Sequence, residues 1–222
     1  MLLNVVKYWR YVLGTTERRE RERQELRTRI LDAARELFAE QGYDAVTMRG
    51  IAERIEYSPT AIYFHFRDKE TLLRELCDKD FAALAQDFQK IAKTADPIER
   101  LRMIGRAYVA FAIEHPSHYR LMFMTPKPAL RAADSHITRG NPEQDAYAFL
   151  RATVAEAIAE GSLRSEFVDA DLVSQMVWAG VHGVVSLQIA KRGDDWVEWR
   201  APQTTAHALI ETMICGLLRE EK

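Results

Sequence analysis

Hydroxyl, phenol and amine side chains gather within and just beyond the stretch TMRGIAERIEYSPTAIYFHF, residues 47–66. Ser58 and Thr60 carry small hydroxyls that can hydrogen-bond to DNA bases or phosphates. Tyr63 offers a phenol that is long enough to reach a phosphate oxygen. Lys69 adds a positive charge beside a predicted helix start, which is a ready place for a phosphate. These residue types favour contact with DNA.

The side chains that enzymes use do not form a recognisable set in this sequence. It contains no Gly-rich phosphate loop, no Gly-x-Ser-x-Gly and no Cys-x-x-Cys motif. His115 and His118 are three positions apart, but Pro116 separates them and no cysteine or carboxylate pattern accompanies them. We therefore expect no catalytic residues, no metal site and no cofactor.

Two short helices separated by a tight turn are predicted to position the DNA-contacting residues. Thr47 is a good N-cap for the first of them. The apolar face of this helix consists of Met48, Ile51, Ala52 and Ile55. Ser58 and Pro59 begin the second helix, because serine caps helices and proline suits the first helical position. The pattern is typical of a helix-turn-helix, whose second helix lies in the major groove.

Many positions of different chemical type between residues 29 and 73 fall in a specific order. They are Gly42-Tyr43, Thr47, Ile51-Ala52, Ser58, Ile62-Tyr63, Phe66, Lys69-Glu70 and Leu72-Leu73. In this stretch the chain resembles the TetR family of repressors. The resemblance implies phosphate contacts for Tyr63 and Lys69, and a groove-facing surface from Ser58 to Ala61 together with His65. The expected DNA-binding residues are Thr47, Arg49, Ser58, Pro59, Thr60, Ala61, Tyr63, His65 and Lys69.

Glu56 departs from the pattern of the family, which usually has glycine in this turn. The position typically requires a positive φ, which costs a residue other than glycine roughly 1 kcal/mol or more. We therefore expect a turn that is strained or slightly altered in shape. The negative charge of Glu56 is also expected to weaken the affinity for operator DNA.

The composition favours an all-α fold. The 222 residues include 10 Gly and 7 Pro, and long stretches combine Ala, Leu, Glu, Arg and Gln. No segment alternates apolar and polar residues as a half-buried strand does. We predict about nine helices in three parts: a charged extension at 1–24, a three-helix helix-turn-helix domain at 25–73, and a helical ligand-binding and dimerisation domain at 74–222. Residues 125–142, which hold three prolines, are predicted to form a loop.

The N-terminal extension is predicted to be either a solvated helix or a mobile arm. Eight Lys and Arg stand against four Glu in residues 1–29, and within residues 17–29 no apolar stripe precedes Leu26. The first folded helix is expected from about Glu25 to Gln41, with Gly42 as its C-terminal cap. Arg18, Arg19, Arg21 and Arg23 are candidates for additional phosphate contacts.

A second informative segment, MVWAGVHGVV, spans residues 176–185. Its Trp178, His182 and Gly183 resemble a Trp-x-x-x-His-Gly motif of one TetR subgroup. The helix is apolar on two opposite sides, so both sides require a partner surface. We expect one side to face the core and the other to join the last helix in a four-helix bundle between two copies of the chain. The expected homodimer interface is Met176, Gly180, Gly183, Val184, Leu187, Leu209, Ile210, Met213 and Leu217.

Aromatic and methionine side chains of the C-terminal helices are candidates for an apolar effector pocket. They are Met103, Phe111, Tyr119, Met122, Phe123, Phe149, Trp178 and His182. Residues of these types at helical spacing more often form core than a binding site. His182 fits a ligand-binding role or that of a core histidine that bonds to a backbone carbonyl or a buried carboxylate. Both interpretations stay open.

Cysteine use and hydropathy bear on location. Cys77 and Cys215 lie far apart within helical patterns, so the sequence predicts a reduced cytoplasm and not a disulfide framework. The longest run without a charged residue, Leu172–Ala190, is predicted to be a buried helix and not a membrane span.

Together these patterns predict a ligand-responsive regulator of transcription, which an unidentified small molecule releases from double-stranded operator DNA and which acts as a homodimer. Two alternatives are a small-molecule enzyme or binding protein on a helical scaffold, and an architectural or activating DNA-binding protein without a ligand. Within residues 47–66 the alternative is a helical hairpin with only a packing role. Tyr63 would then pack on the first folded helix, and His65 would be an ordinary surface histidine.

Overall fold

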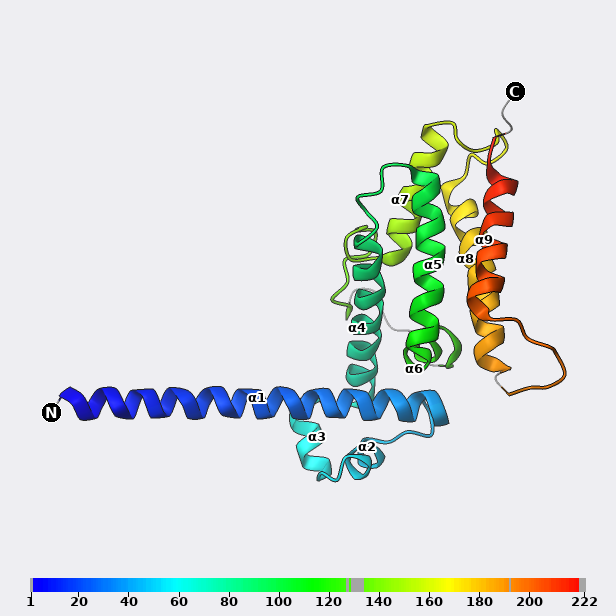
Figure 1. Cartoon of the computed structure of the whole chain (residues 1–222). Helices are drawn as coiled ribbons and strands as arrows, with labels where there is room; N and C mark the ends of the chain where they lie inside the picture. Colours follow the sequence, from blue (N-terminus) through cyan, green and yellow to red (C-terminus); the bar gives the residue numbers. More distant parts are fainter. Residues whose placement is uncertain (1, 127, 129–133, 192, 220–222) are drawn as a thin grey trace. The chain divides into compact units, whose positions relative to one another are not determined.

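The computed structural model describes residues 2–126, 128, 134–191 and 193–219, with side chains from Thr16 onward. Within these ranges the chain forms nine α-helices, one π-helical turn and no strand, apart from an isolated bridge between Leu163 and Leu218. The chain divides into two compact units, Met1–Leu76 and Cys77–Lys222. The prediction of an all-α fold is confirmed (Figure 1).

The first unit is built from α1 (Leu2–Gln41), α2 (Met48–Arg54), α3 (Pro59–His65) and the beginning of α4 (Lys69–Gln89). Figure 1 shows α2 and α3 on one side of α1. Each helix contributes apolar side chains that are almost completely buried. They are Ile30, Phe38, Ile51, Ala52, Ile62, Phe66, Leu72, Leu73 and Leu76. This core fixes the two short helices, which are too short to be stable alone.

The predicted start of the first helix near Glu25 is wrong, because α1 is continuous from Leu2 to Gln41. Residues 17–29 are mostly Arg, Glu and Gln, which are good helix formers. Ion pairs and hydrogen bonds one turn apart support this segment, among them Arg18 with Glu22. The side chains from Thr16 to Glu25 are exposed, so this part of the extension is a solvated helix and not a mobile arm.

The second unit contains the end of α4 and five further α-helices. They are α5 (Pro97–Glu114), α6 (Pro116–Tyr119), α7 (Ala146–Ala159), α8 (Ala170–Ala190) and α9 (Pro202–Leu217), with the π-helical turn η1 (Arg120–Met124) after α6. Helix α5 packs against α7, α8 and α9. Three of these helices begin with proline at the first position, where the missing N–H costs nothing.

Helix α7 begins later than the predicted Glu143. Asp145 caps it, because its carboxylate accepts hydrogen bonds from the backbone N–H groups of Tyr147 and Ala148 at 3.0 and 3.1 Å. The predicted loop at 125–142 contains no α-helix among its described residues, and residues 127 and 129–133 lie outside the described ranges.

Helix α8 is the one helix of the described ranges that is long and apolar enough to cross a membrane by length and composition. One of its faces is buried in the core of the second unit through Val173, Val177, Val181 and Val185. The opposite face exposes Leu172, Met176 and Leu187. The helix is therefore apolar on two sides, as the sequence predicts, and only one side is covered within the chain.

Candidate nucleic-acid interface and effector site

The two helices of the helix-turn-helix begin at the predicted caps. The Thr47 Oγ1 accepts a hydrogen bond from the Gly50 N–H at 3.0 Å, and the Ser58 Oγ accepts one from the Ala61 N–H at 3.3 Å. Pro59 occupies the first turn of α3. Both hydroxyls keep their own proton for a further partner, so capping leaves Ser58 able to donate a hydrogen bond.

The turn between these helices has the predicted strain. Glu56 adopts a φ of +60°, and no other residue except glycine has a positive φ within the described ranges. The Tyr57 N–H closes the turn on the Ala52 carbonyl at 2.9 Å. Because the side chain of Glu56 is exposed, nothing in the core requires this residue type, and the strain is a local cost.

The outer surface of α3 carries most of the predicted DNA-binding residues. Pro59 and Thr60 are exposed, and Tyr63 is 54% exposed, while Ala61 and His65 are half-buried. Burial lowers the pKa of His65, and the positive charges of Arg27 and Arg23 lower it further. At neutral pH this imidazole is therefore uncharged and offers one N–H donor.

Phe64 belongs to the same surface, and sequence reasoning gave it no role. Its side chain is 75% exposed. A signal was present, because Ile62 and Phe66 are one turn apart on the buried face, which places Phe64 on the other side of α3.

Lys69 has a structural role that sequence reasoning did not assign. Its ammonium donates hydrogen bonds to the backbone carbonyls of Tyr43 at 2.7 Å, Val46 at 2.9 Å and Asp44 at 3.5 Å, and it lies 4.1 Å from the centre of the Tyr43 ring. These bonds account for all three ammonium protons. Lys69 thus holds the connection between α1 and α2, and its phosphate contact stays a prediction.

Arg49, another predicted contact, is exposed at the start of α2 and forms an ion pair with Glu53 at 2.9 Å. An exposed pair one helical turn apart is weak, at about 0.3–0.5 kcal/mol. This arginine can therefore exchange its partner for a phosphate at little cost.

Three arginines of α1 lie over three aromatic rings of the helix-turn-helix region. Arg23 lies 5.9 Å from the centre of the Phe64 ring, Arg27 lies 4.4 Å from that of Phe66, and Arg29 lies 5.1 Å from that of Tyr57.

Two of these arginines also bind the backbone of the helix-turn-helix. Arg27 donates to the His65 carbonyl at 3.1 Å and pairs with Glu75. Arg29 donates to the Ile55 carbonyl at 3.2 Å. Part of the basic charge near the N-terminus therefore holds α2 and α3 in place, a role that sequence reasoning missed.

A hydrogen-bonded aromatic cluster lies in the second unit. The indole N–H of Trp178 donates to the Tyr108 hydroxyl at 3.1 Å, and this hydroxyl donates to that of Tyr119 at 3.0 Å. The Nδ1 of His182 lies 2.5 Å from the Tyr119 hydroxyl and 3.1 Å from that of Tyr108. Phe123 covers the group, with its ring centre 5.0 Å from that of Tyr119 and 5.9 Å from that of Trp178.

Burial determines the charge of these groups. It raises the pKa of Tyr108 to about 12, raises that of Tyr119 further, and lowers that of His182. The cluster is therefore neutral at neutral pH. If the Tyr119 hydroxyl donates to Nδ1 of the neutral imidazole, the single ring proton of His182 is on Nε2.

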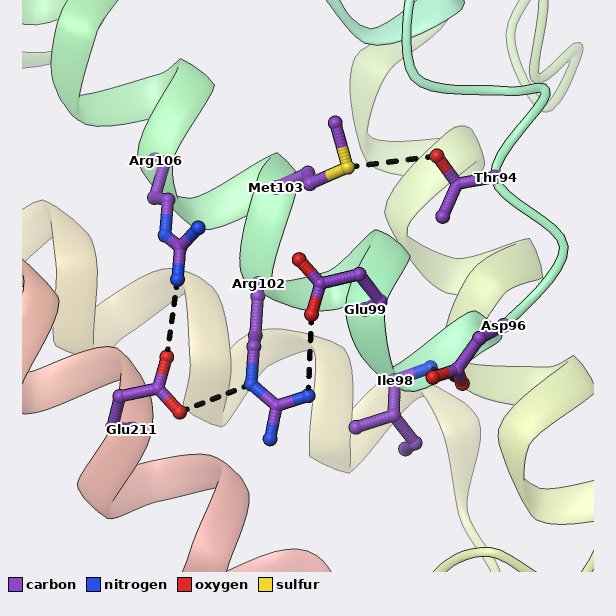
Figure 2. Close-up of polar contacts among 8 residues, drawn as sticks. All are labelled: Thr94, Asp96, Ile98, Glu99, Arg102, Met103, Arg106 and Glu211. Atoms are coloured by element: carbon purple, nitrogen blue, oxygen red, sulfur yellow. Dashed lines mark hydrogen bonds and ion pairs between the residues drawn. The ribbon is translucent and has the colours of Figure 1, made fainter.

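Only part of the predicted effector set meets in this cluster. Tyr119, Phe123, Trp178 and His182 come together, and their partner Tyr108 was not among the predicted residues. Four other predicted residues take part in core packing instead. Phe111 packs on His115 and His118, Phe149 packs on Phe88, Met122 is buried, and Met103 accepts a hydrogen bond from the Thr94 hydroxyl at 3.5 Å (Figure 2).

A separate pocket of about 440 Å³ lies between α5 and α9. Its lining is Arg106, Val109, Ala110, Ile113, Glu114, Gln203, Ala206, His207 and Ile210. Next to it, Arg102 and Arg106 of α5 both bind Glu211 of α9, at 3.0 and 3.3 Å (Figure 2). The hydrogen bond from Arg102 lowers the pKa of Glu211, so this link between the helices stays charged. None of the predicted effector residues lines this pocket.

The predicted dimer interface also divides into two groups. Met176 and Leu187 are exposed, and Val184, Leu209 and Met213 are half-buried. A Cβ atom on Gly183 would have no atom within 4 Å, so its surroundings are open.

Two other predicted interface residues are corrected, and Gly180 also makes a contact within its own chain. Ile210 and Leu217 are buried in the core of their own chain. Gly180 serves contact within the chain, since a Cβ atom there would lie 2.5 Å from the Met213 sulfur.

Each of the two units matches a known protein family. Residues 30–76 match the family described as bacterial regulatory proteins, tetR family, and residues 101–213 match the tetracyclin repressor-like C-terminal domain. The regulator UidR of Escherichia coli strain K12 is 37% identical over 84 residues, which cover 37% of this chain and 39% of UidR. The repressor KstR of Rhodococcus jostii is 34% identical over 98 residues, 41% of this chain and 43% of KstR. The chain thus matches less than half of the length of these curated relatives.

A solved structure shares most of the fold. The fatty acid degradation regulator FadR of Bacillus halodurans superposes with a TM-score of 0.69 at 17% identity, over 86% of this chain and 95% of FadR. At this identity the likeness concerns the fold alone.

Proposed function

The chain belongs to the TetR family of bacterial regulatory proteins, and on that basis we propose that it represses transcription by binding operator DNA until a small molecule releases it. Regulation of transcription, and not catalysis, is the activity of the family. The observation that carries the proposal is the outer surface of α3. Thr60 and Tyr63 are exposed there, while Ile62 and Phe66 anchor the opposite side in the core. This arrangement suits a helix that enters the major groove.

Selection from a random duplex library, followed by binding measurements on the full chain, tests this proposal. We expect a preferred site whose affinity falls steeply with salt concentration, because phosphate contacts dominate. Tyr63→Phe should weaken binding to all sequences similarly, whereas Thr60→Ala should alter sequence preference. A chain that selects no preferred site at moderate salt would refute the proposal.

The aromatic cluster of the second unit is the proposed effector site. Phe123, Trp178 and His182 are half-buried, so a ligand can reach them with modest rearrangement. The rings offer an apolar surface. With the Tyr119 hydroxyl donating to Nδ1, the ring proton of His182 is on Nε2, which makes no hydrogen bond among the described residues. We infer an effector with an apolar, flat body and an acceptor oxygen for this N–H.

Thermal unfolding of the full chain against a compound library tests the effector site. Compounds that raise the melting temperature should also release operator DNA, and Trp178→Ala should abolish both effects. Ile113→Ala is the matched control, because Ile113 lines the separate pocket between α5 and α9. Loss of compound binding in Ile113→Ala alone would move the effector to that pocket.

The proposed signal from the effector runs through α4, which supplies Leu72 to the core of the first unit and Leu84 to that of the second. The buried carboxylate of Asp80 on α4 lies 2.9 Å from Nδ1 of His118 on α6, and η1, which follows α6, carries Phe123. Displacement of Phe123 by a ligand would therefore be passed to α4. Asp80→Asn should retain compound binding and lose DNA release.

We further propose a homodimer, acting in the cytoplasm, in which the exposed face of α8 meets a second copy. Leu172, Met176 and Leu187 are apolar and exposed on that face, and Gly183 leaves room for close approach. A dimer also supplies two reading helices for two half-sites about 34–36 Å apart.

A further inference from the structure

Phe64 is the most exposed aromatic ring among the described side chains of the first unit, at 75%. A phenylalanine left in water forgoes the stabilisation that burial of its ring would provide. Phe66, two positions further along the chain, is by contrast buried, with a side chain that is only 1% exposed. An exposed ring on the outer side of α3 is therefore available to a surface that covers it.

The ring of Phe64 is held in place from two sides. The Arg23 guanidinium of α1 lies 5.9 Å from its centre, and the edge of the His65 imidazole approaches it with ring centres 5.7 Å apart. Arg23 is itself held by Glu20 at 3.6 Å. The extension of α1 beyond the predicted helix start thus supplies a side chain that orients a ring on α3.

The position of Phe64 on α3 limits what can cover it. Thr60 lies one helical turn before Phe64 and is exposed on the same side. A phenyl ring cannot hydrogen-bond to a phosphate or to the polar edge of a base. The apolar group that base edges present in the major groove is the C5-methyl of thymine.

We propose that Phe64 packs on the 5-methyl group of an operator thymine, and that Arg23 positions the ring for this contact. The inference rests on the proposed binding of operator DNA through α3. It assigns to the N-terminal extension a part in reading sequence, in place of the phosphate contact that its charge suggests.

Single replacements of thymine by deoxyuridine test the proposal, because they remove the methyl group and change nothing else. The full chain is titrated with its selected duplex and with each singly replaced duplex. We expect one position in each half-site at which the replacement weakens binding about fourfold, the equivalent of one buried methyl group. In Phe64→Ala this ratio should fall to about one. Tyr63→Phe is the control: it should weaken binding and keep the ratio.

Arg23→Gln tests the positioning role. The thymine-to-uracil ratio should fall while the dependence of affinity on salt stays as in the wild type, and Arg19→Gln, on the same extension, should leave the ratio unchanged. A preserved ratio with a salt slope lower by about 0.9 would show that Arg23 binds a phosphate, and would overturn its positioning role. Equal binding of every replaced duplex, or a ratio that persists in Phe64→Ala, would overturn the contact itself. Failure to select any site would instead refute operator binding.

Discussion

The outer surface of α3 and the aromatic cluster of the second unit present their polar groups in opposite ways. On α3, a helix of seven residues, Thr60, Tyr63 and Phe64 expose a hydroxyl, a phenol and a ring to solvent, and buried Ile62 anchors the same helix. In the cluster, Tyr108, Tyr119, Trp178 and His182 bond to one another across as many as 74 positions of sequence. The first surface is set by local helix geometry, and the second exists only after α5, α6 and α8 have packed.

This difference predicts different responses to substitution. A change on α3 should alter DNA binding without altering stability, provided that it leaves the buried anchors in place. A change in the second unit should alter folding and ligand binding together, because the same side chains serve both. The predictions that follow test this contrast within matched pairs of residues.

The largest expected effect separates two phenylalanines of the first unit. Phe66→Ala removes a buried ring that also carries the Arg27 guanidinium, so we expect a loss of about 3–5 kcal/mol in the free energy of unfolding and no operator binding. Phe64→Ala removes an exposed ring and should change stability by less than about 0.5 kcal/mol. Chemical denaturation of both variants measures the contrast. Equal losses would show that α3 has no free outer surface.

Two glycines of α8 form the second pair. A side chain on Gly180 would meet Met213 within the same chain, so Gly180→Leu should destabilise the second unit by about 1–3 kcal/mol. A side chain on Gly183 would enter open space, so Gly183→Leu should fold normally and weaken the dimer. Thermal unfolding measures the loss of stability. Sedimentation of both variants at micromolar concentration measures the weakening of the dimer. A wild-type chain that stays monomeric would refute the proposed four-helix bundle between two copies.

These helices also show which features of the structure can be predicted from the sequence. Caps, proline positions and helical spacing predict α2 and α3 closely, because they depend on interactions over a few residues. The division of α8 was harder, since both Gly180 and Gly183 fit a close helix approach. Only the packing of α9 shows that Gly180 faces Met213 and that Ile210 belongs to the core.

The binding partners of the charged side chains were the hardest feature of the site to predict. Lys69 and Arg27 have the residue types of phosphate ligands, yet both bind backbone carbonyls of the first unit. Which acceptor a long flexible side chain takes depends on where the folded chain places its carbonyl groups. Spacing along the sequence does not contain that information.

A smaller effect is expected in the turn before α3. Glu56→Gly should stabilise the first unit by about 1 kcal/mol, because glycine adopts a φ of +60° without strain. It should also tighten operator binding, since a negative charge near the phosphates is removed. Glu56→Gln separates the two causes, because it removes the charge and keeps the strain. Should Glu56→Gln match the glycine variant in stability, the strain would have no measurable cost.

The smallest effect concerns the two histidines whose pKa burial lowers, His182 in the cluster and His65 on α3. As pH falls below about 6.5, the unfolded chain takes up protons that the folded chain resists, so stability should decline on acidification and recover as pH rises. Tryptophan fluorescence during urea unfolding, at pH values on both sides of about 6.5, measures this slope. His182→Phe should reduce the slope for the second unit, and operator DNA should leave this reduction unchanged. For His65 the bound phosphates favour the charged imidazole, so DNA should diminish its part of the slope. If DNA instead removed the contribution of His182, that imidazole would be coupled to the DNA-binding unit.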